Sequence, residues 1–177
     1  MGWKGCLLPL LFPLSVLVIG SWRLAVDDHA SKSADRQSSA VVAPTKPNYQ
    51  QPPPGTYPTC DDNPALGDAL LSEGQRLGIS VQAGEPELPG KDATYRAEPG
   101  RLGTITLKQR PMSPLVRCLL ISHEFIHVLQ HLHGNLRGVP PLGWSTGHPD
   151  PIPQEAEAYG HQRRAGYVLS LLQATSP

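Results

Sequence analysis

The sequence predicts a small α+β domain over residues 59–177, and two observations carry this prediction. Apolar residues recur at helical spacing near residue 70, along residues 114–133 and again after residue 154. Between the first two of these runs lie short segments rich in Tyr, Thr and Ile that are separated by Gly and Pro, which is the pattern of strands joined by turns. Helices that flank a group of short strands make an α+β domain.

Charge and cysteine content exclude several classes of protein. The 177 residues hold 15 Lys and Arg against 15 Asp and Glu, so the formal net charge of zero predicts no nucleic-acid partner and no binding to an anionic membrane surface. Three Cys are too few for a disulfide scaffold, and they lack the CxxC spacing of a thiolate zinc ribbon or a dithiol redox site. Proline, at 20 residues, is roughly twice as frequent as average, which places much of the chain outside helices.

The first 58 residues are expected to precede the folded domain. Residues 5–22 carry no charge, have nearly the length of a membrane-spanning helix, and are followed by no good small-residue cleavage site. We therefore expect residues 1–26 to be a signal anchor, with a cleaved signal peptide as the alternative, and the domain to be membrane-anchored or secreted and extracytoplasmic. Residues 27–58 contain six prolines and no apolar periodicity, so we expect a disordered Pro/Ser-rich linker there.

Two helices of the domain have clear starting signals. Asn63 followed by Pro64 is typical of the cap and first turn of a helix, which Gly78 can end. Ser113 followed by Pro114 predicts the start of a longer helix that continues to residue 133.

The remaining elements are short strands and a final helix. Strands are expected at residues 79–82, 93–96 and 105–108. The last two are joined through Pro99, Gly100 and Gly103, so they are candidates for neighbouring antiparallel strands. After a loop rich in Gly and Pro, one helix is expected over residues 154–173.

Residues 123–127 of the long helix read His-Glu-Phe-Ile-His, an HExxH motif. Because residues four positions apart differ by only about 40° around a helix, His123 and His127 project from one face and can hold a single metal ion. Glu124 lies beside them, where a carboxylate can activate a metal-bound water without ligating the metal. The motif therefore predicts a Zn²⁺ site with Glu124 as the general base.

Two histidines and a water leave tetrahedral zinc one protein ligand short, and several side chains are candidates for it. His133 has the spacing of the third histidine in the metzincin pattern, but Gln130 stands where that pattern needs a chain-reversing Gly. His148 lies in the loop before the final helix. Glu155 and Glu157 lie in the first turns of that helix.

With HExxH followed by Glu-Ala-Glu-Ala at residues 155–158, the chain resembles the gluzincin metallopeptidases. The resemblance extends over residues 58–177 in the order of the elements. It implies a zincin-like domain in which a helix, short antiparallel strands, the HExxH helix and a Glu-bearing C-terminal helix follow one another. In this family an extended peptide substrate pairs with the edge strand beside the HExxH helix, and residues 102–108 are expected to be that strand.

The same resemblance implies roles for individual residues. His123, His127 and Glu155 would bind zinc, while Glu124 would be the catalytic base. Glu157 would face solvent or form a salt bridge. Tyr159 departs from the family, which commonly has there an Asp or Asn that orients a ligand histidine.

The activity that the resemblance implies is zinc-dependent hydrolysis of peptide bonds in a peptide or protein substrate. Glu124 would take a proton from the attacking water and pass it to the leaving amine. The tetrahedral intermediate also needs a donor for its oxyanion, and Tyr159, His148 and His161 are the candidates.

Other functions and one covalent link stay open. A catalytically inactive zinc-containing binding domain, an amidase of cell-wall peptide with the same ligands, and a metal-free helical interaction module are the alternatives. Cys60 and Cys118 are either a disulfide, if the domain faces an oxidising compartment, or two buried thiols. The sequence predicts no oligomeric state.

Overall fold

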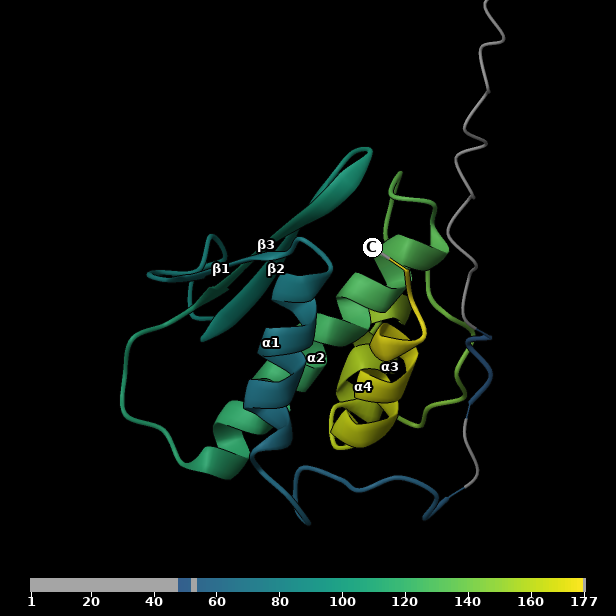
Figure 1. Ribbon diagram of the computed structural model, residues 1–177, viewed down its shortest axis with the longest axis horizontal. Helices are drawn as coiled ribbons and strands as arrows, with labels where there is room; N and C mark the ends of the chain where they lie inside the picture. The colour runs from purple at the N-terminus through teal and green to yellow at the C-terminus, as the bar shows by residue number, and fades with distance from the viewer. Residues whose placement is uncertain (1–47, 52–53, 177) are drawn as a thin grey trace, which may run out of the picture. The chain divides into compact units, whose positions relative to one another are not determined.

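The computed structural model describes residues 48–51 and 54–176, in which a three-stranded sheet packs with four helices (Figure 1). This confirms the predicted α+β class. The elements in chain order are α1 (Leu66–Arg76), β1 (Ser80–Ala83), β2 (Ala93–Glu98), β3 (Arg101–Leu107), α2 (Pro114–His133), α3 (Pro153–His161) and α4 (Ala165–Gln173).

The expected signal anchor or signal peptide, residues 1–26, lies outside the described residues, and so does the expected linker up to residue 47. Along the described part of the chain, no helix has both the length and the apolar character needed to cross a membrane. The end of the expected linker contacts the domain: the Tyr49 carbonyl accepts a 2.5 Å hydrogen bond from the Trp144 indole, and the Gln50 carbonyl accepts one from the Tyr167 hydroxyl.

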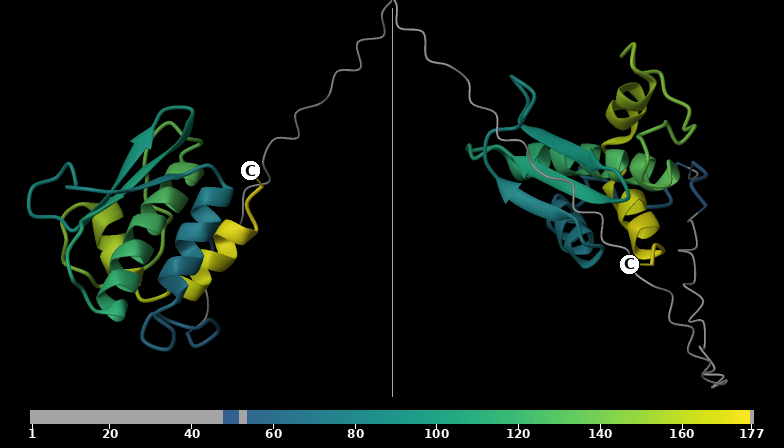
Figure 2. Two further views of the ribbon diagram at one scale, coloured as in Figure 1. Left: turned by 60° about the vertical axis from the view of Figure 1, so that its left-hand side comes forward. Right: turned by 90° about the horizontal axis from the view of Figure 1, so that it is seen from above.

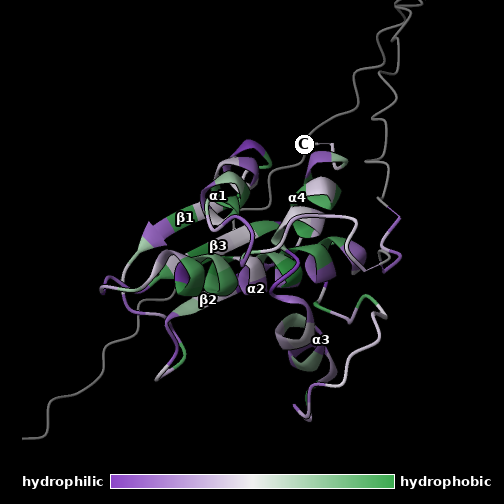
Figure 3. Ribbon diagram, turned by 90° about the horizontal axis from the view of Figure 1, so that it is seen from below, coloured by the Kyte–Doolittle hydropathy of each residue, from purple (hydrophilic) through white to green (hydrophobic). Residues whose placement is uncertain are grey.

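Helix α2 is the central element of the domain. Seen from above, β2 and β3 lie across it (Figure 2). On its flanks, α1 and α4 lie to one side and α3 to the other (Figure 3). Every residue from Ile121 to His131 is buried, so three turns of this helix have little contact with solvent. The polar residues in these turns are therefore removed from water, which costs free energy unless they find partners.

The ends of α2 agree with the prediction. The Ser113 side chain accepts a 3.2 Å hydrogen bond from the backbone of Val116, Pro114 occupies the first turn, and Gly134 follows the last helical residue. Close packing of α1 on α2 depends on two glycines. A Cβ at Gly67 would lie 3.1 Å from Cα of Cys118, and one at Gly74 would lie 2.5 Å from the ring of Phe125.

The sheet differs from the predicted one in its strand order. The order is β1-β3-β2, in which β2 and β3 form the expected antiparallel pair and β1 is parallel to β3. The expectation that residues 102–108 form the edge strand is therefore wrong, because β3 is flanked on both sides. The free edge beside α2 belongs to β2, which contacts that helix. Local sequence patterns specify strands but not their neighbours, because pairing is decided by contacts across the whole domain.

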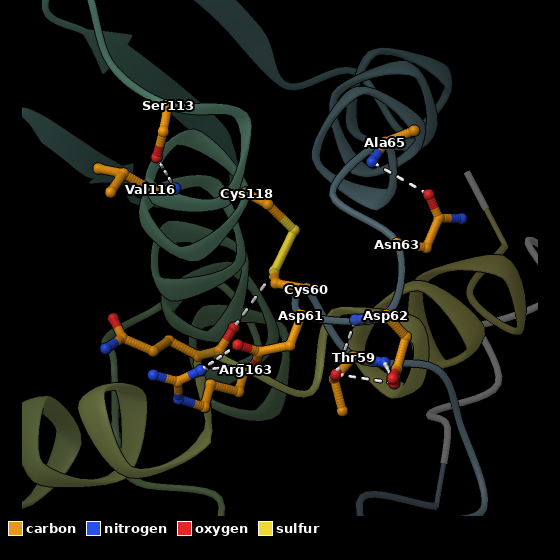
Figure 4. Close-up of a disulfide and its surroundings, with 11 residues drawn as sticks. Thr59, Cys60, Asp61, Asp62, Asn63, Ala65, Ser113, Val116, Cys118 and Arg163 are labelled. Carbon is orange, nitrogen blue, oxygen red and sulfur yellow. Dashed lines mark hydrogen bonds and ion pairs between the residues drawn. A yellow bond between two sulfur atoms is a disulfide. The ribbon is translucent and has the colours of Figure 1, made fainter.

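A disulfide joins Cys60, before α1, to Cys118 in α2, with 5.8 Å between the two Cα atoms (Figure 4). The chain around Cys60 also explains why the single helix expected over residues 154–173 is wrong. The Cys60 N–H donates to the carbonyl of Arg163 at 2.9 Å, and the Gly166 N–H donates to the carbonyl of Pro58 at 3.1 Å. In one continuous helix the Arg163 carbonyl would accept from Tyr167 and the Gly166 N–H would donate to Gln162. Both groups bind the crossing segment instead, so the helix is divided into α3 and α4.

Candidate metal centre

The two motif histidines lie one turn apart on the buried part of α2. Their Nε2 atoms are 3.1 Å apart, and their rings meet edge to face with 4.8 Å between centroids. His123 is 7% exposed and His127 is 8% exposed. Both imidazoles therefore present one nitrogen to the same point at the surface of the helix, as the motif predicts.

Glu155 reaches the same point from the first turn of α3. Its Oε2 is 3.5 Å from Nε2 of His123, and its Oε1 is 3.2 Å from Nε2 of His127. Among the described residues, this is the one group of three His, Cys, Asp or Glu side chains with converging ligand atoms, all within 4.8 Å of one another. The three residues could therefore hold a metal ion, and they are the three named by the sequence.

The other candidate ligands lie elsewhere. The His133 ring packs against Tyr49, with 5.5 Å between centroids. The His148 ring stacks on Tyr159 at 4.8 Å from an exposed position in the loop before α3. Glu157 is 2% exposed, so the expectation that it faces solvent or forms a salt bridge is wrong.

Charges couple the three converging residues. Hydrogen bonds from the two histidines hold the pKa of the Glu155 carboxyl well below its usual range. Burial acts to lower the pKa of His127, but the hydrogen bond to Glu155 and the nearby charge of Glu124 outweigh it and raise that pKa. The site thus stabilises the negatively charged form of Glu155 beside positively charged groups. A bound cation would meet the same negatively charged carboxylate.

Glu124 is 5% exposed and lines the cleft in front of the two histidines. Burial raises the pKa of its carboxyl, while the positive charge on His123 and His127 and the backbone N–H of Tyr95 act in the opposite direction. A buried carboxyl with a raised pKa is suited to accept and release a proton near neutral pH.

The cleft in front of the two histidines lies between β2, α2 and α3. One wall is formed by β2 and the residues before it, and the floor by α2. Its lining residues are Leu88, Lys91, Asp92, Ala93, Thr94, Tyr95, Leu120, His123, Glu124, His127, Glu155, Tyr159 and Gln162.

His127 is held in place by two buried residues behind the cleft. Its Nδ1 lies 2.7 Å from Oε1 of Gln130, and Nε2 of Gln130 donates to Glu157 at 2.8 Å. Glu157 also accepts hydrogen bonds of 2.7 Å from the backbone of Leu142 and of Trp144. Sequence reasoning missed this chain of contacts, because its members come from α2, α3 and the loop between them.

The other motif histidine has a different environment. Its Nδ1 is buried, and within the described part of the chain it has no hydrogen-bond partner. The ring of Tyr159 packs against the His123 ring instead, with 4.4 Å between centroids. Tyr159 thus supports His123 by aromatic contact at the position where gluzincins commonly have a hydrogen-bonding Asp or Asn.

Of the three candidate oxyanion donors, only Tyr159 lines the cleft. Its hydroxyl accepts a 2.9 Å hydrogen bond from Nζ of Lys91, a residue that the sequence gave no reason to single out. His161 is buried against the Trp144 ring, and its Nε2 lies 3.0 Å from the Ser145 carbonyl, so its role is structural.

Comparison of the chain with protein-family models, with curated proteins and with solved structures found no match. The chemistry of the site is therefore inferred from its own side chains.

Proposed function

We propose that the chain is a zinc peptidase of the gluzincin type, with a zincin-like fold and with His123, His127 and Glu155 as the metal ligands. Three contacts carry the proposal: the two histidine Nε2 atoms lie 3.1 Å apart, Oε1 of Glu155 lies 3.2 Å from that of His127, and Oε2 of Glu155 lies 3.5 Å from that of His123. Zinc bonds of about 2.0–2.1 Å at tetrahedral angles separate neighbouring ligand atoms by about 3.3 Å. The two histidine nitrogens have about this spacing, and a Glu155 oxygen lies at about this distance from each of them, so the three side chains would hold a zinc ion between them.

Zinc is the metal that this ligand set suits best. Two imidazoles and one carboxylate with an open position make up the ligand set of many catalytic zinc sites, whereas structural zinc sites usually have four protein ligands. The hydrogen bond that Nδ1 of His127 donates to Oε1 of Gln130 has the form expected behind a ligand histidine, since such partners fix the ring and its tautomer.

When bound, zinc supplies a Lewis acid that lowers the pKa of a water and polarises the scissile carbonyl. Glu124 accepts the proton of the attacking water on its carboxylate and then delivers it to the leaving nitrogen. The Tyr159 hydroxyl, which shares the cleft, donates a hydrogen bond to the oxyanion as it forms. The buried position of Glu124 supports this role, since it keeps the carboxylate beside the site in one place.

The free edge of β2 supports an extended peptide as substrate. The Asp92 carbonyl accepts a 2.8 Å hydrogen bond from the backbone N–H of Lys108. In an antiparallel pair every second residue directs its N–H and C=O to the partner strand, so Thr94 and Arg96 direct theirs toward β3. Ala93 and Tyr95 then direct their backbone groups away from the sheet, where the Tyr95 N–H contacts the Glu124 carboxylate, and both residues line the cleft. A peptide that adds to this edge would run along the cleft past the metal ligands.

The Cys60–Cys118 disulfide supports the proposal that the domain is secreted or membrane-anchored and faces an oxidising compartment.

The inactive zinc-containing domain and the cell-wall amidase remain the alternatives. A buried carboxylate that lines the cleft without being a ligand favours catalysis over a purely structural zinc.

The proposal is tested with the full chain and its Glu124→Gln variant. Zinc content should be equal in the two proteins, and casein hydrolysis by the variant should fall by at least about 100-fold. Glu85→Gln, at a side chain that is 78% exposed, is the matched control and should leave hydrolysis unchanged. Full activity in the Glu124 variant would overturn the mechanism, and hydrolysis of wall fragments without hydrolysis of casein would favour the amidase.

A further inference from the structure

We propose that Lys91 makes the cleft selective for peptides that place a carboxylate beside it, either a C-terminal α-carboxylate or an Asp or Glu side chain. This inference rests on the proposed peptidase function and names the substrate class of the same site. Its basis is the position of one ammonium group that, within the described residues, forms no ion pair with a carboxylate.

Lys91 is held at the cleft by Tyr159 and by the anchored residue that follows it. Its Nζ donates to the Tyr159 hydroxyl at 2.9 Å and lies 5.5 Å from the centroid of that ring. The next residue, Asp92, is fixed by a two-point ion pair with Arg110, with contacts of 2.7 and 2.5 Å. The ammonium therefore projects from an anchored part of the chain rather than from a free loop.

Among the residues that line the cleft, Lys91 is the only Lys or Arg. Its hydrogen-bond partner is the phenol hydroxyl of Tyr159, whereas most other described cations contact a carboxylate. Those pairs are Arg76–Glu73, Arg96–Glu87, Arg101–Glu98, Lys108–Glu85, Arg110–Asp92, Arg117–Asp68 and Arg163–Asp61.

The carboxylates that line the cleft form no ion pair with Lys91. Asp92 is engaged by Arg110, and Glu155 lies against the two histidines. Glu124 and Glu155 do act on Lys91 from a distance, since their charges add to the hydrogen bond with Tyr159 in raising its pKa. The ammonium is thus charged, close to the reaction site and available to a substrate carboxylate.

The surroundings of Lys91 suit a peptide end or side chain. Leu88 is 57% exposed and lines the cleft, and Leu120 contributes a second apolar surface. An apolar wall beside a single ammonium favours a chain whose hydrocarbon part packs while its carboxylate meets Nζ. A charge-assisted contact of this kind changes affinity by roughly tenfold or more.

The test uses the full chain with Glu124→Gln, so that peptides bind without being cleaved, both metal-free and loaded with zinc. Dissociation constants are measured by calorimetry for peptide pairs that differ in one group: a free or an amidated C-terminus, and an internal Glu or Gln. We expect one carboxylate form to bind about tenfold tighter than its neutral partner, and the pair that shows this identifies which carboxylate is recognised.

The Lys91→Met variant should abolish this preference in both metal states, whereas Lys91→Arg should retain it. Lys108→Met, at a lysine outside the cleft, is the matched control and should leave it intact. The proposal would be overturned if the preference survived Lys91→Met. It would also be overturned if Lys91→Met weakened the binding of the carboxylate peptide and of its neutral partner equally. Failure of the peptidase proposal is separate, because it would appear as missing zinc or missing hydrolysis while the metal-free binding measurement still reports on Lys91.

Discussion

The carboxylate of Glu157 accepts a 2.8 Å hydrogen bond from the side-chain amide of Gln130, and both residues are almost fully buried, at 2% and 0% exposed. The other end of the same amide lies 2.7 Å from Nδ1 of His127. A buried polar contact of this kind is costly unless every group is satisfied, and here Glu157 receives two further backbone hydrogen bonds. The candidate metal centre is therefore contacted by α3 from behind, through Glu157, as well as at the cleft, through Glu155.

Replacing Gln130 should weaken metal binding without unfolding the domain. Gln130→Met keeps the volume of the side chain but removes the group that orients His127, so zinc affinity should fall by about 10- to 100-fold. Competition with a chelating dye measures this affinity, and circular dichroism checks the fold. Gln75→Met, at an exposed position on α1, is the control. An unchanged zinc affinity in the Gln130 variant would contradict the positioning role.

Glu157→Gln should destabilise the domain and loosen the loop before α3. The variant presents an amide to three donors, from Gln130, Leu142 and Trp144, so at least one hydrogen bond to a buried charge is lost. We expect the free energy of unfolding to fall by about 2–3 kcal/mol. Urea unfolding measures the loss, and hydrogen exchange should be faster at the Leu142 and Trp144 amides. Equal exchange in the two proteins would contradict this role.

Removing the disulfide should cost more than any single contact. Cys60 and Cys118 are 58 residues apart in sequence, and closing a loop of that length stabilises the folded state by about 4 kcal/mol in the chain-entropy account. The double Cys→Ala variant should unfold at correspondingly lower urea concentration. A reducing agent should destabilise the wild type but leave the double variant unaffected. Equal stability of the two proteins would show that the disulfide does not form in solution.

The stability of the metal-free protein should depend on pH through His127 and Glu155. The raised pKa of His127 adds stability that is complete below its ordinary value of 6.5 and is lost as pH rises through the raised value. The lowered pKa of Glu155 adds stability that is complete above its ordinary value of 4.5 and is lost as pH falls through the lowered one. Both contributions are therefore complete between pH 4.5 and pH 6.5.

Urea unfolding of chelator-treated protein from pH 4 to pH 9 checks this dependence. The Glu155→Gln variant removes the carboxylate charge on which both pKa shifts depend. The stability of the variant should therefore vary less with pH than that of the wild type. Identical profiles would mean that the two side chains do not interact in the metal-free protein.

Local signals predicted the parts of the site that lie on one helix. Ser113 and Pro114 specify the start of α2, and helical geometry then puts His123 and His127 on one face. Glu155 is indicated as a candidate ligand by the Glu-Ala-Glu-Ala string rather than by any physical rule that brings α3 to α2.

The rest of the fold depends on contacts between distant segments. The strand order places β2 rather than β3 at the edge, and the crossing of Cys60 past Arg163 divides the final helix. Lys91 reaches Tyr159, 68 positions away, only because the sheet and α3 form two sides of one cleft. No periodicity or capping signal encodes these approaches.

The most direct test of the metal centre is the zinc content of the full chain after dialysis against metal-free buffer. We expect about one zinc ion per chain in the wild type and in His133→Ala, and little or none in Glu155→Ala, because a site with one protein ligand fewer holds zinc weakly. Full zinc content in Glu155→Ala together with its loss in His133→Ala would contradict the proposed ligand set and the gluzincin assignment with it.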